Sequence, residues 1–158
     1  NYSIARNGIR YGKNMTCTEF LSSIKSYNAQ IAPPPDSSDI ILANTNLQNM
    51  RAAMLPNFMI ELYSQCGAIV LDCGYIFGPT EIARNKDYPV PDIVSINKKL
   101  IGISQINNKT VFGRNDLFWF AFDAFGKCEM LDNISLTVMR KYDDAWRAMY
   151  DCLIAGKL

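Results

Sequence analysis

The fold of this chain is decided by residues 55–82, which read LPNFMIELYSQCGAIVLDCGYIFGPTEI. Leu55 and Pro56 open the stretch, and proline suits a first helical turn because its missing N–H would have no partner there. Apolar side chains then recur at helical spacing, and Gly67 follows where a left-handed residue commonly ends a helix. The pattern predicts a helix over 56–66 whose buried face is formed by Phe58, Met59, Leu62, Tyr63 and Cys66.

Two short strands are expected after this helix. The apolar run 68–71 is only long enough for a strand, and 74–77 continues extended. Gly78 and Pro79 then turn the chain. A short helical turn is expected around Thr80–Ala83.

These residues resemble the signature of the SUKH superfamily (Smi/Knr-like domains). In that family a Leu-Pro opens a helix, strands follow, and a Gly-x-Ile-x-Gly-like turn precedes an acidic and an aliphatic residue, matched here by 74–82. Residues 118–123 (FWFAFD) are similar to a later strand pair of the family. The resemblance extends over residues 36–155, and the positions that carry its structural signature are Leu55, Pro56, Gly67, Gly78, Pro79 and Trp119.

The resemblance implies a protein that works by binding. Members of the superfamily occur beside polymorphic toxin genes in bacteria and neutralise a cognate toxin, often a nuclease, and others are scaffold or regulatory domains. The family supplies no catalytic residues to transfer. Residues 36–158 would form the SUKH-like α+β domain, and residues 1–35 an N-terminal arm and first helix of the same globule.

Composition excludes several classes. The chain has 158 residues, enough for one domain, and its 16 basic and 15 acidic residues leave almost no net charge. This balance argues against a general nucleic-acid binder, which would carry a basic excess. No window of about 18 apolar residues exists. No signal peptide is visible in the sequence that begins at Asn1, and a leader that was already removed is the alternative. We expect a cytoplasmic protein without a membrane partner.

The remaining sequence predicts an α+β fold. A capping box at Thr16 and Glu19 starts a helix, and a second helix begins near Asp36 and is interrupted around residues 44–46. Asp92 should cap a helix over 93–99, and Tyr142 or Asp143 the last one. Further strands are expected at 100–103, 110–113, 117–123, 128–131 and 134–139. Short connections force antiparallel pairing, so we expect a mostly antiparallel sheet of five to six strands with helices on one face and at the ends.

No catalytic constellation is visible. The absence of histidine excludes Ser-His-Asp and Cys-His catalysis and histidine-ligated zinc. The five cysteines are scattered without a C-x-x-C pair, which favours buried thiols over disulfides or a metal site, and no cofactor motif is present. A hydrolase with paired carboxylates stays an alternative, drawing on Asp72, Glu81, Asp87, Asp92, Asp116 and Asp123.

The aromatic run 118–122 admits two interpretations. Aromatic side chains on a sheet face can stack nucleic-acid bases, but without a flank rich in glycine and lysine a core strand is favoured.

Binding is then the leading hypothesis. Acidic and aromatic residues near the signature turn would meet a basic surface of a toxin, and the predicted contact residues are Asp72, Glu81, Asp87, Tyr88 and Asp92. An intracellular scaffold domain with an ordinary protein partner is the main alternative.

Overall fold

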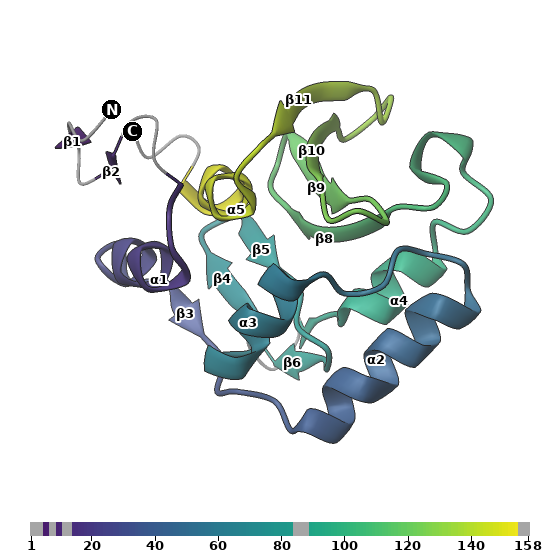
Figure 1. The fold of residues 1–158 in the computed structure, drawn as a ribbon, viewed down its shortest axis with the longest axis horizontal. Coiled ribbons are helices and arrows are strands. Elements are labelled where there is room, and N and C mark those ends of the chain that lie inside the picture. Colours follow the sequence, from purple (N-terminus) through teal and green to yellow (C-terminus); the bar gives the residue numbers. More distant parts are fainter. Residues whose placement is uncertain (1–4, 7–8, 11–13, 84–88, 155–158) are drawn as a thin grey trace.

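A seven-stranded antiparallel sheet forms the centre of the computed structural model, which describes residues 5–6, 9–10, 14–83 and 89–154 (Figure 1). Its strand order is β11-β10-β9-β8-β5-β4-β3. Two separate two-stranded ribbons pair β1 with β2 and β6 with β7. The strands of the sheet are β3 (Gln30–Ile31), β4 (Ile69–Leu71), β5 (Gly74–Ile76), β8 (Thr110–Arg114), β9 (Phe118–Phe122), β10 (Cys128–Asp132) and β11 (Val138–Tyr142); the ribbons are β1 (Ala5–Arg6), β2 (Ile9–Arg10), β6 (Ile82–Ala83) and β7 (Pro89–Val90).

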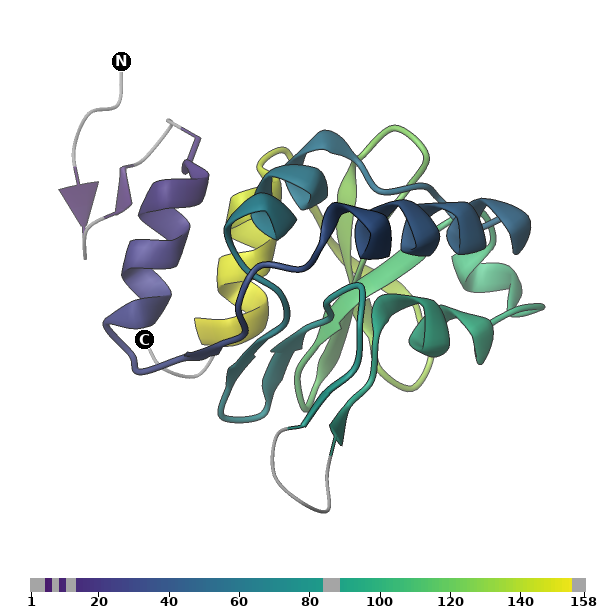
Figure 2. The same cartoon turned by 90° about the horizontal axis from the view of Figure 1, so that it is seen from below.

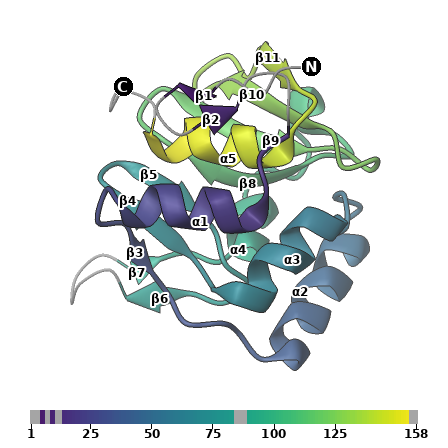
Figure 3. The same ribbon diagram turned by 60° about the vertical axis from the view of Figure 1, so that its left-hand side comes forward.

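The helices lie on one face of the sheet and at its ends, which confirms the predicted α+β class. Helix α5 crosses one face, α1 packs on α5, and α4 packs on β8 with α2 against it (Figures 1 and 3). Helix α3 shares the face of α5, because the ring of Phe58 contacts those of Phe112, Phe122 and Trp146. The helices are α1 (Cys17–Lys25), α2 (Ser37–Asn49), α3 (Asn57–Gln65), α4 (Ile93–Lys98), the 3-10 helix η1 (Ser104–Ile106) and α5 (Ala145–Ile154).

Two glycines bring α5 close to the sheet. A Cβ on Gly113 would lie 2.7 Å from the Tyr75 carbonyl oxygen and 3.1 Å from Sγ of Cys152, and a Cβ on Gly74 would lie 2.8 Å from the Cys152 carbonyl oxygen. Both glycines therefore face α5. Because side chains alternate along a strand, their neighbours Tyr75 and Arg114 face the opposite side of the sheet.

Helix α4 is attached to β8 beyond the point where β5 stops pairing with that strand. The β5–β8 register covers only Tyr75 with Arg114 and Ile76 with Gly113. Beyond it, the buried Asn97 side chain takes the place of a strand: Nδ2 donates to the carbonyl of Val111, and Oδ1 accepts from its N–H, both at 2.8 Å. Asn97 thus satisfies backbone groups that would otherwise be buried without partners.

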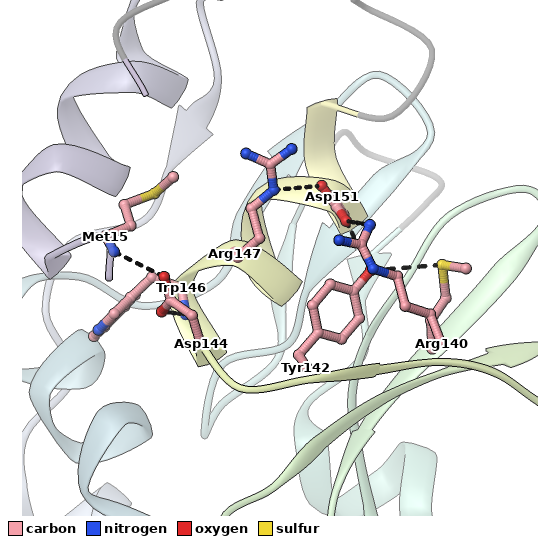
Figure 4. Close-up of polar contacts among 8 residues, drawn as sticks. Met15, Arg140, Tyr142, Asp144, Trp146, Arg147 and Asp151 are labelled. Atoms are coloured by element: carbon pink, nitrogen blue, oxygen red, sulfur yellow. Dashed lines mark hydrogen bonds and ion pairs between the residues drawn. The ribbon is translucent and has the colours of Figure 1, made fainter. Parts of the chain in front are cut away.

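The carboxylate of Asp151 ties α5 to β11 (Figure 4). It accepts hydrogen bonds from Tyr142 and Arg140, each at 2.8 Å, and pairs with Nε of Arg147 at 3.3 Å. Burial and this neighbouring carboxylate raise the pKa of the Tyr142 phenol above its usual value. At the start of α5, Asp144 accepts from the Met15 N–H at 2.7 Å, which joins the entry of α1 to the same helix.

Several predicted elements are confirmed. The capping box of Thr16 and Glu19 starts α1, the Asp92 side chain caps α4 through the Ser95 N–H, and β4, β5, β8, β9 and β10 lie where expected. Buried side chains of α1, including Phe20 and Ile24, belong to the main hydrophobic core.

Other boundaries were wrong. Helix α2 is continuous through 44–46, because Asn44 turns its side chain to accept from the Leu55 N–H at 2.8 Å. The expected helix at 80–83 contains β6, whose partner is β7. The expected strand at 100–103 is a turn, in which Gly102 has φ 91°. The sheet has seven strands because the two-residue β3, too short for a sequence pattern, pairs with β4.

The C-terminal elements also begin later than predicted. The strand expected at 134–139 is β11 (Val138–Tyr142), because Asp132 accepts from the N–H groups of Ile134 and Ser135 and turns the chain. Tyr142 therefore lies in β11, and Asp144 accepts from the Trp146 N–H at the start of α5. The backbone of Gly67 is not in the left-handed region. Glycine fits this position because a Cβ there would lie 3.0 Å from the Pro33 carbonyl oxygen.

Candidate binding site

The predicted contact residues are distributed over several elements. Asp72 is exposed in the β4–β5 turn with φ 51°, and Glu81 is exposed just before β6. The β4–β5 turn and the paired β6 and β7 project to the same side of the molecule (Figures 2 and 3). Asp87 and Tyr88 lie outside the described residues.

Asp92 already has a structural role. Its two carboxylate oxygens accept from the N–H and the hydroxyl of Ser95 at 2.8 and 2.9 Å, so they cap the first turn of α4. The side chain is half-buried. A charge change at Asp92 would therefore disturb the helix as well as any partner contact.

A hollow of about 290 Å³ has Pro91, the neighbour of Asp92 in the sequence, in its lining. Its walls come from β5, β7, β8 and α4, and its lining is mostly apolar. The lining residues are Tyr75, Phe77, Pro89, Val90, Pro91, Ile96 and Arg114. A dry cavity of about 150 Å³ holds one benzene molecule, so this hollow has room for a group larger than one ring.

Arg114 provides the only charge among the described lining residues. Its Nε is shielded from solvent, and no hydrogen-bond partner for this atom exists within the described part of the chain. An arginine donor that is removed from water usually has an acceptor, since leaving it unsatisfied costs about 1–3 kcal/mol or more. The hollow therefore combines apolar walls with an unsatisfied cationic donor.

Two aromatic residues flank this arginine on the sheet. Tyr75 of β5 and Trp119 of β9 are both directly opposite Arg114 in the strand register. Opposed residues of an antiparallel sheet share a face, with Cβ atoms about 4.5–5.5 Å apart. All three side chains are half-buried. The Arg114 row, defined as Tyr75, Arg114 and Trp119, thus presents a cation between two aromatic side chains.

The buried thiols are poorly suited to nucleophilic chemistry. All five cysteines are free, and only Cys73 is exposed. Burial raises the pKa of Cys66 and of Cys128 to about 12, and it also raises the pKa of Cys152, so these groups stay protonated near neutral pH. The described residues contain no group of three or more Cys, Asp or Glu side chains arranged to hold a metal ion.

A second exposed feature lies at the edge of the sheet. The two turns that precede β9 and β11 are joined by a hydrogen bond from the Asn133 N–H to the Leu117 carbonyl at 3.1 Å. Leu117 and Ile134, on these turns, are 65% and 88% exposed, and Val138 and Met139 follow on β11 with 37% and 55% exposed. We call Leu117, Ile134, Val138 and Met139 the β11 edge surface.

Comparison of the chain with known protein families, with curated proteins and with solved structures finds no match. No helix in the described ranges combines the length and the hydropathy needed to span a membrane.

Sequence reasoning missed the central charge of the hollow. The predicted acids Asp87 and Asp92 bracket 89–91 in the sequence, and residues 89–91 line the hollow. Arg114 was missed because a single arginine at a strand end resembles a solvated turn residue. The row of Tyr75, Arg114 and Trp119 forms only because β5, which is far from β8 and β9 in sequence, pairs with β8.

Proposed function

We propose that this protein is a non-catalytic protein-binding module, and that it acts as a bacterial immunity protein that neutralises a cognate toxin by binding it. The observation that carries the proposal is the β11 edge surface. Four large apolar side chains are exposed on β11 and on two turns that are joined by a hydrogen bond, and groups of exposed apolar side chains mark interaction sites.

The backbone supports the same role. Strand β11 is the last strand of the sheet, so one row of its N–H and C=O groups has no partner strand within the described sheet. An edge of this kind can add an extended segment from another protein, with backbone hydrogen bonds for affinity and side-chain contacts for specificity. The resemblance of residues 55–82 to the SUKH superfamily supplies the immunity assignment, and a scaffold domain with a cellular partner is the alternative.

The exposed acids Asp72 and Glu81 would form a second contact with a basic toxin surface. These two residues offer a cleaner test of that contact than Asp92, which caps α4. The partner, its chemistry and a cytoplasmic location remain parts of the proposal.

The test is capture of the protein encoded next to this one, followed by binding kinetics with two double variants. Leu117→Glu with Ile134→Glu should raise the dissociation rate tenfold or more, because charges would be desolvated at the interface centre. Asp72→Lys with Glu81→Lys should mainly slow association. Lack of capture would reject the immunity role, and unchanged kinetics in both variants would reject both surfaces.

A further inference from the structure

We propose that the hollow beside Arg114 binds a carboxylate that is attached to an apolar group, either as a free carboxylic acid or as an acidic residue next to an apolar one in a protein segment. This site is independent of the β11 edge surface. It rests on two observations, the unsatisfied Nε of Arg114 and the apolar walls around it.

The guanidinium group dictates the chemistry of the ligand. A guanidinium cation presents donors in a planar fork that matches the two oxygens of a carboxylate. Nε is part of that fork, and it has no acceptor among the described residues. A carboxylate would satisfy Nε and neutralise the only charge among the described lining residues.

The walls dictate the rest of the ligand. Phe77 and Val90 are buried, Ile96 is half-buried, and Pro89 and Pro91 complete a rigid apolar rim. The volume of about 290 Å³ accommodates a ring or a branched aliphatic group together with the carboxylate. A bare inorganic anion would leave these walls without contacts.

The fold keeps this site in shape. Gly113 and Gly74 pack on α5 and thereby direct Arg114 and Tyr75 away from that helix. Asn97 fastens α4 to β8, and its neighbour Ile96 forms part of the wall. The arginine is therefore held by regular elements instead of a loop, which limits the ordering cost of binding.

The experiment compares two probes that differ only in charge. The ¹⁵N-labelled full chain is titrated with N-acetyl-phenylalanine and with its amide, and backbone amide shifts are followed by NMR. We expect shifts at Tyr75, Val90 and Ile96 with the acid, and a dissociation constant on the order of 1 mM for a ligand of this size. The amide should bind on the order of tenfold more weakly, because it lacks the charge.

Three variants assign the effect to the arginine. Arg114→Gln should weaken binding of the acid on the order of tenfold to a hundredfold while leaving binding of the amide unchanged. Arg114→Lys should retain part of the affinity, since it keeps the charge but loses the fork. Lys141→Gln is the matched control, because it removes an exposed cation from β11, and it should behave as the wild type.

A third probe distinguishes the source of the carboxylate. The capped dipeptide N-acetyl-Phe-Glu-amide carries its only carboxylate on a side chain, so binding as tight as that of the free acid indicates a protein segment, and weaker binding indicates a free carboxylic acid. Equal binding of acid and amide to the wild type, no shifts with either, or full affinity in a folded Arg114→Gln would overturn the proposal. If Arg114→Gln does not fold, the acid and amide comparison on the wild type decides.

Discussion

Replacement of Asn97 by alanine should remove a large part of the stability of this fold. The asparagine side chain makes three buried hydrogen bonds, to both backbone groups of Val111 and to the carbonyl of Ile93, each at 2.8 Å. In Asn97→Ala the N–H and C=O of Val111 stay buried without these partners. Each orphaned group costs about 1–3 kcal/mol, so we expect a loss of about 4 kcal/mol. That is a substantial fraction of the typical 5–15 kcal/mol of a domain.

Urea unfolding followed by circular dichroism measures this loss. With a slope of about 2 kcal/mol per molar urea, the midpoint should fall by about 2 M. Amide hydrogen exchange at Val111 should accelerate as well, because its acceptor is gone. The exposed Asn107 provides the matched control, and Asn107→Ala should change the stability by no more than about 0.5 kcal/mol.

A second substitution separates hydrogen bonding from packing. Asn97→Asp preserves the volume of the side chain but places an oxygen where Nδ2 donates to the carbonyls of Ile93 and Val111. We expect it to destabilise the protein at least as much as alanine at neutral pH. A midpoint shift below about 0.5 M for Asn97→Ala, or wild-type stability for Asn97→Asp, would refute the conclusion that this side chain replaces a strand as the hydrogen-bond partner of Val111.

Three further outcomes are expected. A thiol reagent at pH 8 should modify one cysteine per folded chain, the exposed Cys73, since burial raises the pKa of Cys66 and Cys128 to about 12; mass spectrometry counts the adducts. Backbone N–H donors lower the pKa of Asp132, so the stability difference between wild type and Asp132→Asn should be present at neutral pH and shrink as the pH falls below about 4, as urea titrations at several pH values would show. Gly113→Ala should cost about 1–3 kcal/mol in urea unfolding, because its Cβ would meet a backbone carbonyl at 2.7 Å.

Local signals predicted the elements whose causes are local. The capping box at Thr16, the helix cap at Asp92 and the apolar run of β4 each depend on residues within a few positions, and each was found. The aromatic strand was also predicted as core, and Phe120 and Phe122 are fully buried. Its first residues, Phe118 and Trp119, are only half-buried, although both pack against the core.

Two strands were misplaced, one for a distant cause and one for a local cause. Strand β6 exists because β7 pairs with it, and the sequence of 80–83 read alone favoured a helical turn. Strand β11 begins at Val138 because the Asp132 carboxylate organises the preceding turn, although alternation in the sequence favoured an earlier start. Pairing with β7 outweighed the local pattern at β6, whereas at β11 a short-range side-chain hydrogen bond outweighed the alternation of apolar residues.

The sequence by itself determined the class of the fold, since apolar periodicity and turn residues specify which segments become helices and which become strands. It also determined that histidine-based catalysis is excluded, because that depends on composition alone. Only the tertiary structure placed Arg114 between Tyr75 and Trp119 and left its Nε, beside an apolar hollow, without an acceptor in the described ranges. The physical reason is that strand register and burial arise from the packing of the whole sheet, and residues 75, 114 and 119 acquire a shared face only when three strands pair.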